Sequence, residues 1–238
     1  MNIKDSNKDF QDISKCNLNL HWSYSNWFRH LWTASYIESN FNEYAVIYDI
    51  ACGDAPVYYM LKDNFNFACK NYNGVDAKYF PDHPFEFHEG NFMSISEDNF
   101  ADVVIFTEAI EHLEPVQYTA AIKMIRKLLK PKGKMILSTP TPIKQIEDRV
   151  WPTDHEHELS VQELSKLVNK YFMVDSMSSW SMTTREYNSY LQDNAFARKI
   201  YHKLTGMPSS FKRAVISMTA NLEDGRQTIM VCESRKMR

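Results

Sequence analysis

The chain has 238 residues, of which 44% are hydrophobic and 24% charged, and its formal net charge is −3 at pH 7. This length suits one domain with a sizeable core, and the acidic balance excludes the general basic footprint of a nucleic-acid-binding protein. No apolar stretch approaches the roughly 18 residues of a membrane span, and the N-terminus is polar, so we expect a cytoplasmic protein without a membrane segment.

Apolar runs and helical periodicity alternate along the chain. Residues 1–20 are polar and expected to be loose, whereas residues 21–238 are expected to form one domain. The predicted strands are 46–49, 72–75, 85–88, 101–106, 134–138, 172–176 and 227–232. The predicted helices are 21–41, which is rich in aromatic residues, 57–61, 116–129, 161–171, 195–204 and 209–220. This alternation predicts an α/β fold with a doubly wound, mostly parallel sheet, in which the irregular residues 139–160 form a lid loop.

The first predicted strand runs into a small-residue turn in the segment AVIYDIACGDA. Asp49 ends that strand, and the turn that contains Ala51 and Gly53 can bring the backbone close to a ligand. The next predicted strand closes on Asp76, which lies 23 residues after Gly53. That spacing is close to the roughly 20 residues at which an acid reaches ribose hydroxyls in dinucleotide folds.

Charge decides which adenosine cofactor suits this turn. An NAD site needs three glycines and a helix N-terminus that is open to a pyrophosphate, but Asp54 stands where the phosphate would approach. The sulfonium and ammonium groups of S-adenosylmethionine are positive, and a mouth lined by Asp49, Asp54, Asp76 and Glu108 favours such a ligand. The sequence therefore predicts an S-adenosylmethionine site.

Six segments between about residue 44 and residue 175 resemble the class I S-adenosylmethionine-dependent methyltransferases, in family order and spacing. They are YDIACGDA, YNGVDAKYF, HEGNFMSI, ADVVIFTEAIEHL, IRKLLKPKGKMILSTPTP and DHEHELSVQEL. The set is most similar to the branch that contains ubiquinone-biosynthesis-type O-methyltransferases. The resemblance implies a Rossmann-like, mostly parallel sheet of seven strands in a three-layer α/β/α arrangement, with the last strand reversed.

The same resemblance implies roles for individual positions in binding S-adenosyl-L-methionine. Asp49 would orient the first turn and Gly53 would let the backbone approach the methionine part, while Ala51 replaces a commoner glycine and is accommodated if its φ is negative. Asp76 would accept hydrogen bonds from the ribose hydroxyls, and the amide oxygen of Asn91 would take the place of a usual aspartate at the adenine amino group. The other positions implied to line the cofactor are Ala77, Phe92 and Glu108.

A cluster of acids and histidines follows the fourth predicted strand. Glu108, Glu111 and His112 are spaced at i, i+3 and i+4, which places them on one face of a helical turn. With His155 or His157 they form a candidate divalent-metal site that resembles the one in small-RNA terminal 2′-O-methyltransferases. Without a metal, His112 is the candidate general base, and Glu108 and His157 are further catalytic candidates. A third alternative is that Glu111 is a solvated helix residue.

The predicted function is O-methylation of a small molecule by in-line displacement at the sulfonium methyl. A metal-assisted RNA 2′-O-methyltransferase is an alternative, disfavoured by the acidic net charge. A non-catalytic binding protein on the same fold is another alternative, disfavoured by the acids at positions 49, 76 and 108.

Overall fold

The computed structural model describes residues 20–78, 84–142, 157–180, 184–207, 212, 215–216 and 227–235. The strands are β1 (Val46–Ile50), β2 (Asn71–Asp76), β3 (Glu86–Glu89), β4 (Ala101–Thr107), β5 (Leu129–Pro140), β6 (Phe172–Trp180) and β7 (Gln227–Ser234). The α-helices are α2 (Leu20–Asn40), α3 (Pro56–Phe65), α4 (Tyr118–Leu128), α5 (Val161–Val168), α6 (Thr184–Asp193) and α7 (Ala195–Lys203). The 3₁₀ helices are η2 (Phe92–Ser94), η3 (Ile110–His112) and η4 (Pro115–Gln117).

The strands form one sheet of seven in the order β3-β2-β1-β4-β5-β7-β6. The strands β1 to β5 pair in parallel, whereas β7 is antiparallel to both of its neighbours, β5 and β6. The predicted seven-stranded, mostly parallel sheet with a reversed last strand is therefore confirmed. Because β1, β2 and β4 are parallel neighbours, their carboxyl ends meet at one edge of the sheet.

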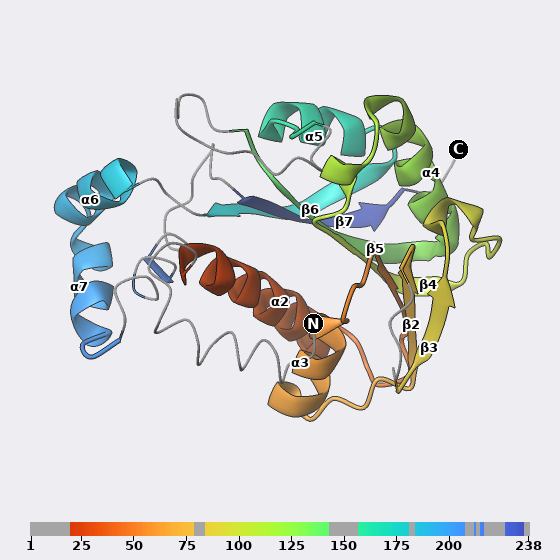
Figure 1. Cartoon of the computed structure of the whole chain (residues 1–238), viewed down its shortest axis with the longest axis horizontal. Helices are drawn as coiled ribbons and strands as arrows, with labels where there is room; N and C mark the ends of the chain where they lie inside the picture. The colour runs from red at the N-terminus through yellow and green to blue at the C-terminus, as the bar shows by residue number, and fades with distance from the viewer. Residues whose placement is uncertain are drawn as a thin grey trace.

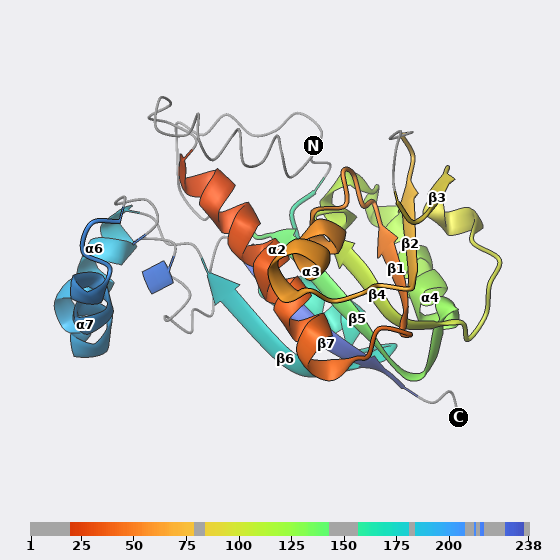
Figure 2. The ribbon, with the colours of Figure 1, turned by 90° about the horizontal axis from the view of Figure 1, so that it is seen from below.

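Helices cover both faces of the sheet, which gives the predicted three layers. Figure 1 shows α4 and α5 on one face and α2 and α3 on the other. Separate apolar cores hold the two faces: Ile50, Val104 and Phe106 face α4 and α5, whereas Ile47 and Ile105 face α2 and α3. Figure 2 shows α2 lying along the sheet beside α3. The chain therefore places its N-terminal aromatic helix on the sheet, as its periodicity predicted.

Local sequence signals explain several of these elements. The β4 segment ADVVIFT is almost wholly buried, which suits a central strand with both faces covered. The helix α5 begins with the predicted capping box, in which Ser160 and Glu163 each accept a hydrogen bond from the other's backbone N–H. In the part of the chain that is described, no helix is long and apolar enough to cross a membrane.

Several boundaries differ from the prediction. The helix predicted to end at residue 129 ends at Leu128, and β5 begins at Leu129, because Leu129 is already extended and pairs with Ala101 of β4. The turn-forming Lys132, with φ 68°, therefore lies inside β5 next to a register shift, and not in a loop after the helix. Residues 139 and 140 of the predicted lid belong to β5, and its residues 143–156 lie outside the described residues. Most of the helix predicted over 209–220 lies there too.

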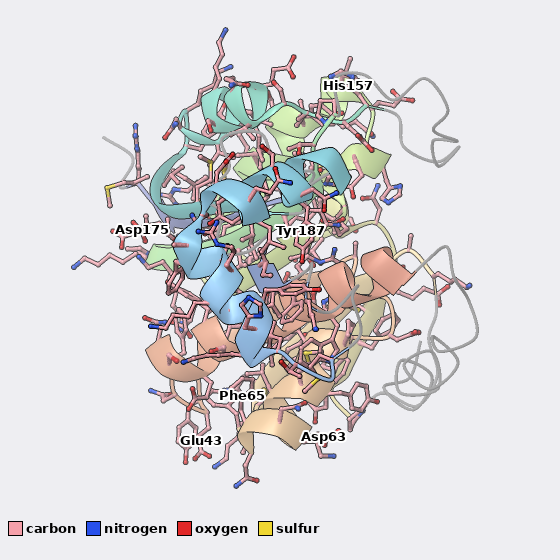
Figure 3. All side chains as sticks on the ribbon, turned by 90° about the vertical axis from the view of Figure 1, so that its left-hand side faces the viewer. Glu43, Asp63, Phe65, His157, Asp175 and Tyr187 are labelled. Carbon is pink, nitrogen blue, oxygen red and sulfur yellow. The ribbon has the colours of Figure 1, made fainter. Side chains whose placement is uncertain are left out.

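The helix α6 was not predicted, and with α7 it forms a small helical pair apart from the two main cores. Tyr187, Ala197 and Ile216 make their own buried cluster. Figure 1 shows the pair beside the sheet and not over either face, and Figure 3 labels Tyr187 on it. The mean hydropathy of α6 is low, which explains why no apolar run marked it in the sequence.

Candidate functional site

The candidate site is built on the turns that follow β1, β2 and β4. In the sheet, Ile50 pairs with Val75 on one side and with Phe106 on the other, so the residues that follow these strands lie at the same edge. Open α/β sheets bind their ligands at this carboxyl edge. The structure therefore gathers the predicted turn, Asp76 and Glu108 at the edge where folds of this class bind their ligands.

The turn between β1 and α3 is built from left-handed backbone. Ala51, Gly53 and Ala55 have φ values of 57°, 52° and 50°. The condition under which alanine would be accommodated at position 51, a negative φ, is not met, so the alanine carries the steric cost of a left-handed conformation. A Cβ added at Gly53 would meet no atom within 4 Å. The backbone at Gly53 therefore borders open space that a ligand could fill.

Asp76, at the end of β2, closes this turn from the neighbouring strand. The backbone N–H of Gly53 donates to Asp76 Oδ2 at 2.9 Å, and the N–H of Lys78 donates to Oδ1 at 3.0 Å. Each carboxylate oxygen has two acceptor positions, so Asp76 can still accept hydrogen bonds from a pair of ligand hydroxyls. The structure thus brings the two predicted cofactor residues into direct contact, and the exposed Ala77 follows them.

Asp49 does not line the mouth of the site, contrary to the sequence interpretation. Its side chain is 3% exposed, and the hydroxyl of Tyr72 donates to its Oδ2 at 2.5 Å. Burial raises the pKa of Asp49 to about 7, with a smaller upward contribution from Asp76, while the bond from Tyr72 opposes the rise. Asp49 therefore lies beneath the turn, and its charge is not displayed at the edge.

Asn91 and Phe92 follow β3 at the far side of the same edge. The side chain of Asn91 caps η2 by accepting a hydrogen bond from the N–H of Met93 at 2.9 Å. Asn91 also lines a cavity of about 260 Å³ together with Val75. Phe92 packs on Phe106 with ring centroids 5.5 Å apart. One lone pair of the Asn91 amide oxygen thus accepts from the Met93 N–H, and the second remains for a ligand.

Glu108 is held in place by donors from three distant elements. An ion pair of 3.2 Å joins its Oε2 to Arg29 Nη1 of α2, and the side chains are 21% and 6% exposed respectively. Ser138 at the end of β5 donates to Oε1 at 2.9 Å, and Gln227 at the start of β7 donates to Oε2 at 3.3 Å. Sequence reasoning missed Arg29, because a single arginine in an aromatic helix has no spacing that marks it.

Glu108, Glu111 and His112 do not share one face of a helical turn. Glu108 has a φ of 50° and precedes η3, which begins at Ile110, so the helical spacing does not apply. Glu111 is 1% exposed and accepts a hydrogen bond from the hydroxyl of Thr139 at 3.1 Å, whereas His112 is exposed. The interpretation of Glu111 as a solvated helix residue is therefore wrong as well.

The buried carboxyl of Glu111 has a changed acidity. Burial, followed by the charge of Glu108, raises the pKa of Glu111 to about 8, while the hydrogen bond from Thr139 and the charge of Arg29 oppose the rise. At neutral pH Glu111 is therefore mostly protonated. The cation of Arg29 lies 3.2 Å from Glu108 and forms an ion pair with it.

The predicted metal ligands are not assembled in the described residues. No group of three or more His, Cys, Asp or Glu side chains that could hold a metal occurs among them. His157 is exposed, and its carbonyl oxygen accepts a hydrogen bond from Tyr118 at 3.1 Å; Figure 3 shows His157 on the side of the sheet that carries α5. His155 lies outside the described residues. The donor set of Glu108, Glu111, His112 and His157 is therefore not supported.

One known protein family matches most of the chain. A family model described as a methyltransferase domain matches residues 23–197, which is well over half of the 238 residues. A search of curated proteins found no match.

Solved structures with similar folds include two methyltransferases and a cyclase. A SAM-dependent methyltransferase from Archaeoglobus fulgidus is 14% identical, with a TM-score of 0.55 over 86% of this chain and 94% of that one. The 1,6-didemethyltoxoflavin-N1-methyltransferase of Burkholderia thailandensis, solved with 1,6-didemethyltoxoflavin and S-adenosylhomocysteine, is 13% identical, with a TM-score of 0.56 over 98% of this chain and 86% of that one. The [4+2]-cyclase SpnF is 18% identical, with a TM-score of 0.57 over 87% of this chain and 81% of that one. At these identities the likeness establishes the fold, and the cyclase illustrates that the fold by itself does not set the reaction.

Proposed function

The chain belongs to the methyltransferase-domain family, and from that premise we propose that it is an S-adenosylmethionine-dependent methyltransferase that methylates an oxygen of a small molecule. The proposal is carried by one observation above all, the 2.9 Å hydrogen bond from Gly53 N–H to Asp76 Oδ2. This contact joins the turn after β1 to the acid after β2. A turn with open space at Gly53 beside a carboxylate fits an adenosine ligand whose ribose hydroxyls need acceptors.

The charge at this edge supports S-adenosylmethionine over a phosphate-bearing cofactor. Asp54 and Asp76 flank the turn, and carboxylates there repel a pyrophosphate but attract a sulfonium or an ammonium group. The residues proposed to hold the cofactor are Asp49, Ala51, Gly53, Asp76, Ala77, Asn91, Phe92 and Glu108. Of these, Asp49 lies beneath the turn, where it accepts a hydrogen bond from Tyr72. It is proposed to support the turn from there and not to line the mouth of the site. When bound, the cofactor supplies a methyl group that is already activated for displacement.

The chain's own task is then to align the acceptor and to remove its proton. An acceptor oxygen lone pair forms the new bond to the methyl carbon, the carbon–sulfur bond breaks with its electron pair on sulfur, and the acceptor proton goes to a base. Glu108 is already held by Arg29, Ser138 and Gln227, which makes it a poor base. His112 is exposed just after β4, so we assign it the role of base, with His157 as a second catalytic candidate.

The acceptor class is proposed from charge and from similarity. A net charge of −3 disfavours a polyanionic acceptor such as RNA. One protein of similar fold is named for the methylation of 1,6-didemethyltoxoflavin, a small molecule. Oxygen as the methylated atom follows from the sequence resemblance to ubiquinone-biosynthesis-type O-methyltransferases.

Two measurements test this function. Titration calorimetry with S-adenosylhomocysteine should give saturable binding by the wild-type chain. Radiolabel from S-adenosylmethionine, incubated with a native cell extract, should enter the small-molecule fraction, and His112→Ala should lower that transfer by about 10²-fold or more with unchanged cofactor affinity. Label in the RNA fraction would replace the small-molecule proposal, and absence of cofactor binding would overturn the function itself.

A further inference from the structure

The ion pair between Arg29 and Glu108 joins the N-terminal helix α2 to the carboxyl edge of the sheet. Both side chains are largely withdrawn from water, and Ser138 and Gln227 also donate hydrogen bonds to the carboxylate. Four elements thus converge on one carboxylate: α2, the loop after β4, the end of β5 and the start of β7. Glu108 has little freedom to leave this position.

Stability alone is a weak explanation for such a pair. The cost of removing two charges from water offsets most of their attraction, and apolar replacements of buried ion pairs are often neutral or stabilising. Another ion-pair network, that of Lys134 with Asp175 and Glu233, already links β5, β6 and β7 in the middle of β5. The position of the Arg29–Glu108 pair, beside the proposed cofactor turn, therefore needs a further reason.

The reason lies in the charge that the pair leaves at the site. Glu108 forms an ion pair of 3.2 Å with Arg29, and burial raises the pKa of the neighbouring Glu111, which favours its uncharged form. Arg29 therefore balances the carboxylate that lies beside it. Without Arg29, one uncompensated negative charge would remain next to the turn that carries Gly53. A cationic ligand at that turn would be bound more tightly by the unbalanced carboxylate than by the balanced pair.

In methyl transfer the positive charge of the donor is present before the reaction and dissipates during it. An unbalanced carboxylate would stabilise the charged ground state more than the transition state, which lowers the rate. We propose that Arg29 is a positioning residue for this reaction: it acts through Glu108, holding the carboxylate in place and offsetting its charge so that the charged donor is not bound at the expense of turnover. This inference rests on the proposed function.

The test compares the affinities of the charged donor and of its neutral product. Titration calorimetry at about pH 6.5, below the pKa of about 8 for Glu111, gives the ratio of the Kd of S-adenosylhomocysteine to that of S-adenosylmethionine. Arg29→Met should raise this ratio by about fivefold or more, and Glu108→Gln should lower it by a similar factor. Arg29→Lys retains the charge and should stay near the wild-type ratio.

The double variant separates charge balance from a structural role. Arg29→Met combined with Glu108→Gln removes both charges, so its ratio should return toward that of the wild type, although each single variant moves it. If the pair were merely structural, each single variant would weaken the binding of S-adenosylmethionine and of S-adenosylhomocysteine together. The double variant would then bind both ligands most weakly. The control is Lys134→Met, which breaks the network with Asp175 and Glu233 in the middle of β5 and should leave the ratio unchanged.

Outcomes for the inference and for the function are distinct. If both single variants keep the wild-type ratio within about twofold, the inference is overturned while the function stands. If the wild-type chain binds neither ligand, the proposed function fails first. Should Arg29→Met not fold, the double variant and Glu108→Gln still decide, because charge balance requires Glu108→Gln to lower the ratio and the double variant to restore it.

Discussion

Replacing Asp76 by alanine removes the acceptor on which the proposed cofactor site depends. In the structure its two oxygens accept from the N–H groups of Gly53 and Lys78 at 2.9 and 3.0 Å, and each oxygen keeps a further acceptor position for a ligand hydroxyl. Hydrogen bonds to a charged group contribute about 1.5–3 kcal/mol, so Asp76→Ala should weaken S-adenosylhomocysteine binding by about 10- to 150-fold.

Titration calorimetry measures this loss, and thermal unfolding of the same samples separates it from misfolding. The matched control is Asp63→Ala, which removes an exposed carboxylate from α3, on the opposite side of the molecule from His157 in Figure 3. Its affinity should equal that of the wild type. A folded Asp76→Ala protein that binds within about twofold of the wild type would refute the ribose assignment.

Three further predictions concern the acid beneath the turn, the turn itself and the absence of a metal requirement. Because burial raises the pKa of Asp49 to about 7, the folded chain keeps a proton that the unfolded chain releases near pH 4, and the unfolding free energy should fall as pH rises between these values. Urea unfolding at a series of pH values measures this slope, and Asp49→Asn should reduce it by up to about 1.4 kcal/mol per pH unit. A slope equal to that of the wild type contradicts the raised pKa. Gly53→Ala meets no protein atom within 4 Å and should cost about 1–2 kcal/mol of stability for its left-handed backbone. The new Cβ should weaken cofactor binding by about tenfold or more, and a folded variant that binds within about twofold of the wild type would show that this Cβ does not face the ligand. EDTA should leave label transfer unchanged, and a loss that Mg²⁺ restores would revive the metal-assisted alternative.

Sequence patterns correctly predicted those helices and strands in which the conformation favoured by the local sequence is also the one that the packed fold requires. The run ADVVIF is a central strand because β-branched and aromatic residues suit burial on both faces. Ser160 and Glu163 start α5 because both capping hydrogen bonds are local. The 23-residue spacing from Gly53 to Asp76 predicted an acid that serves the same cofactor site as the turn. In the structure this spacing spans one helix between two parallel neighbours, and a hydrogen bond joins the two residues.

The charges of the site were decided by the tertiary structure. Spacing placed Glu108, Glu111 and His112 on one face, but the left-handed backbone at Glu108 turns Glu111 toward Thr139 and leaves His112 in solvent. Likewise Asp49 is adjacent to the turn in sequence but buried against Tyr72 in space. The sequence identifies the ionisable side chains, whereas their exposure and their partners depend on elements that come into contact only after folding. The pairing of Arg29 with Glu108, 79 residues apart in the sequence, is the clearest example, because it forms only when α2 packs across the sheet.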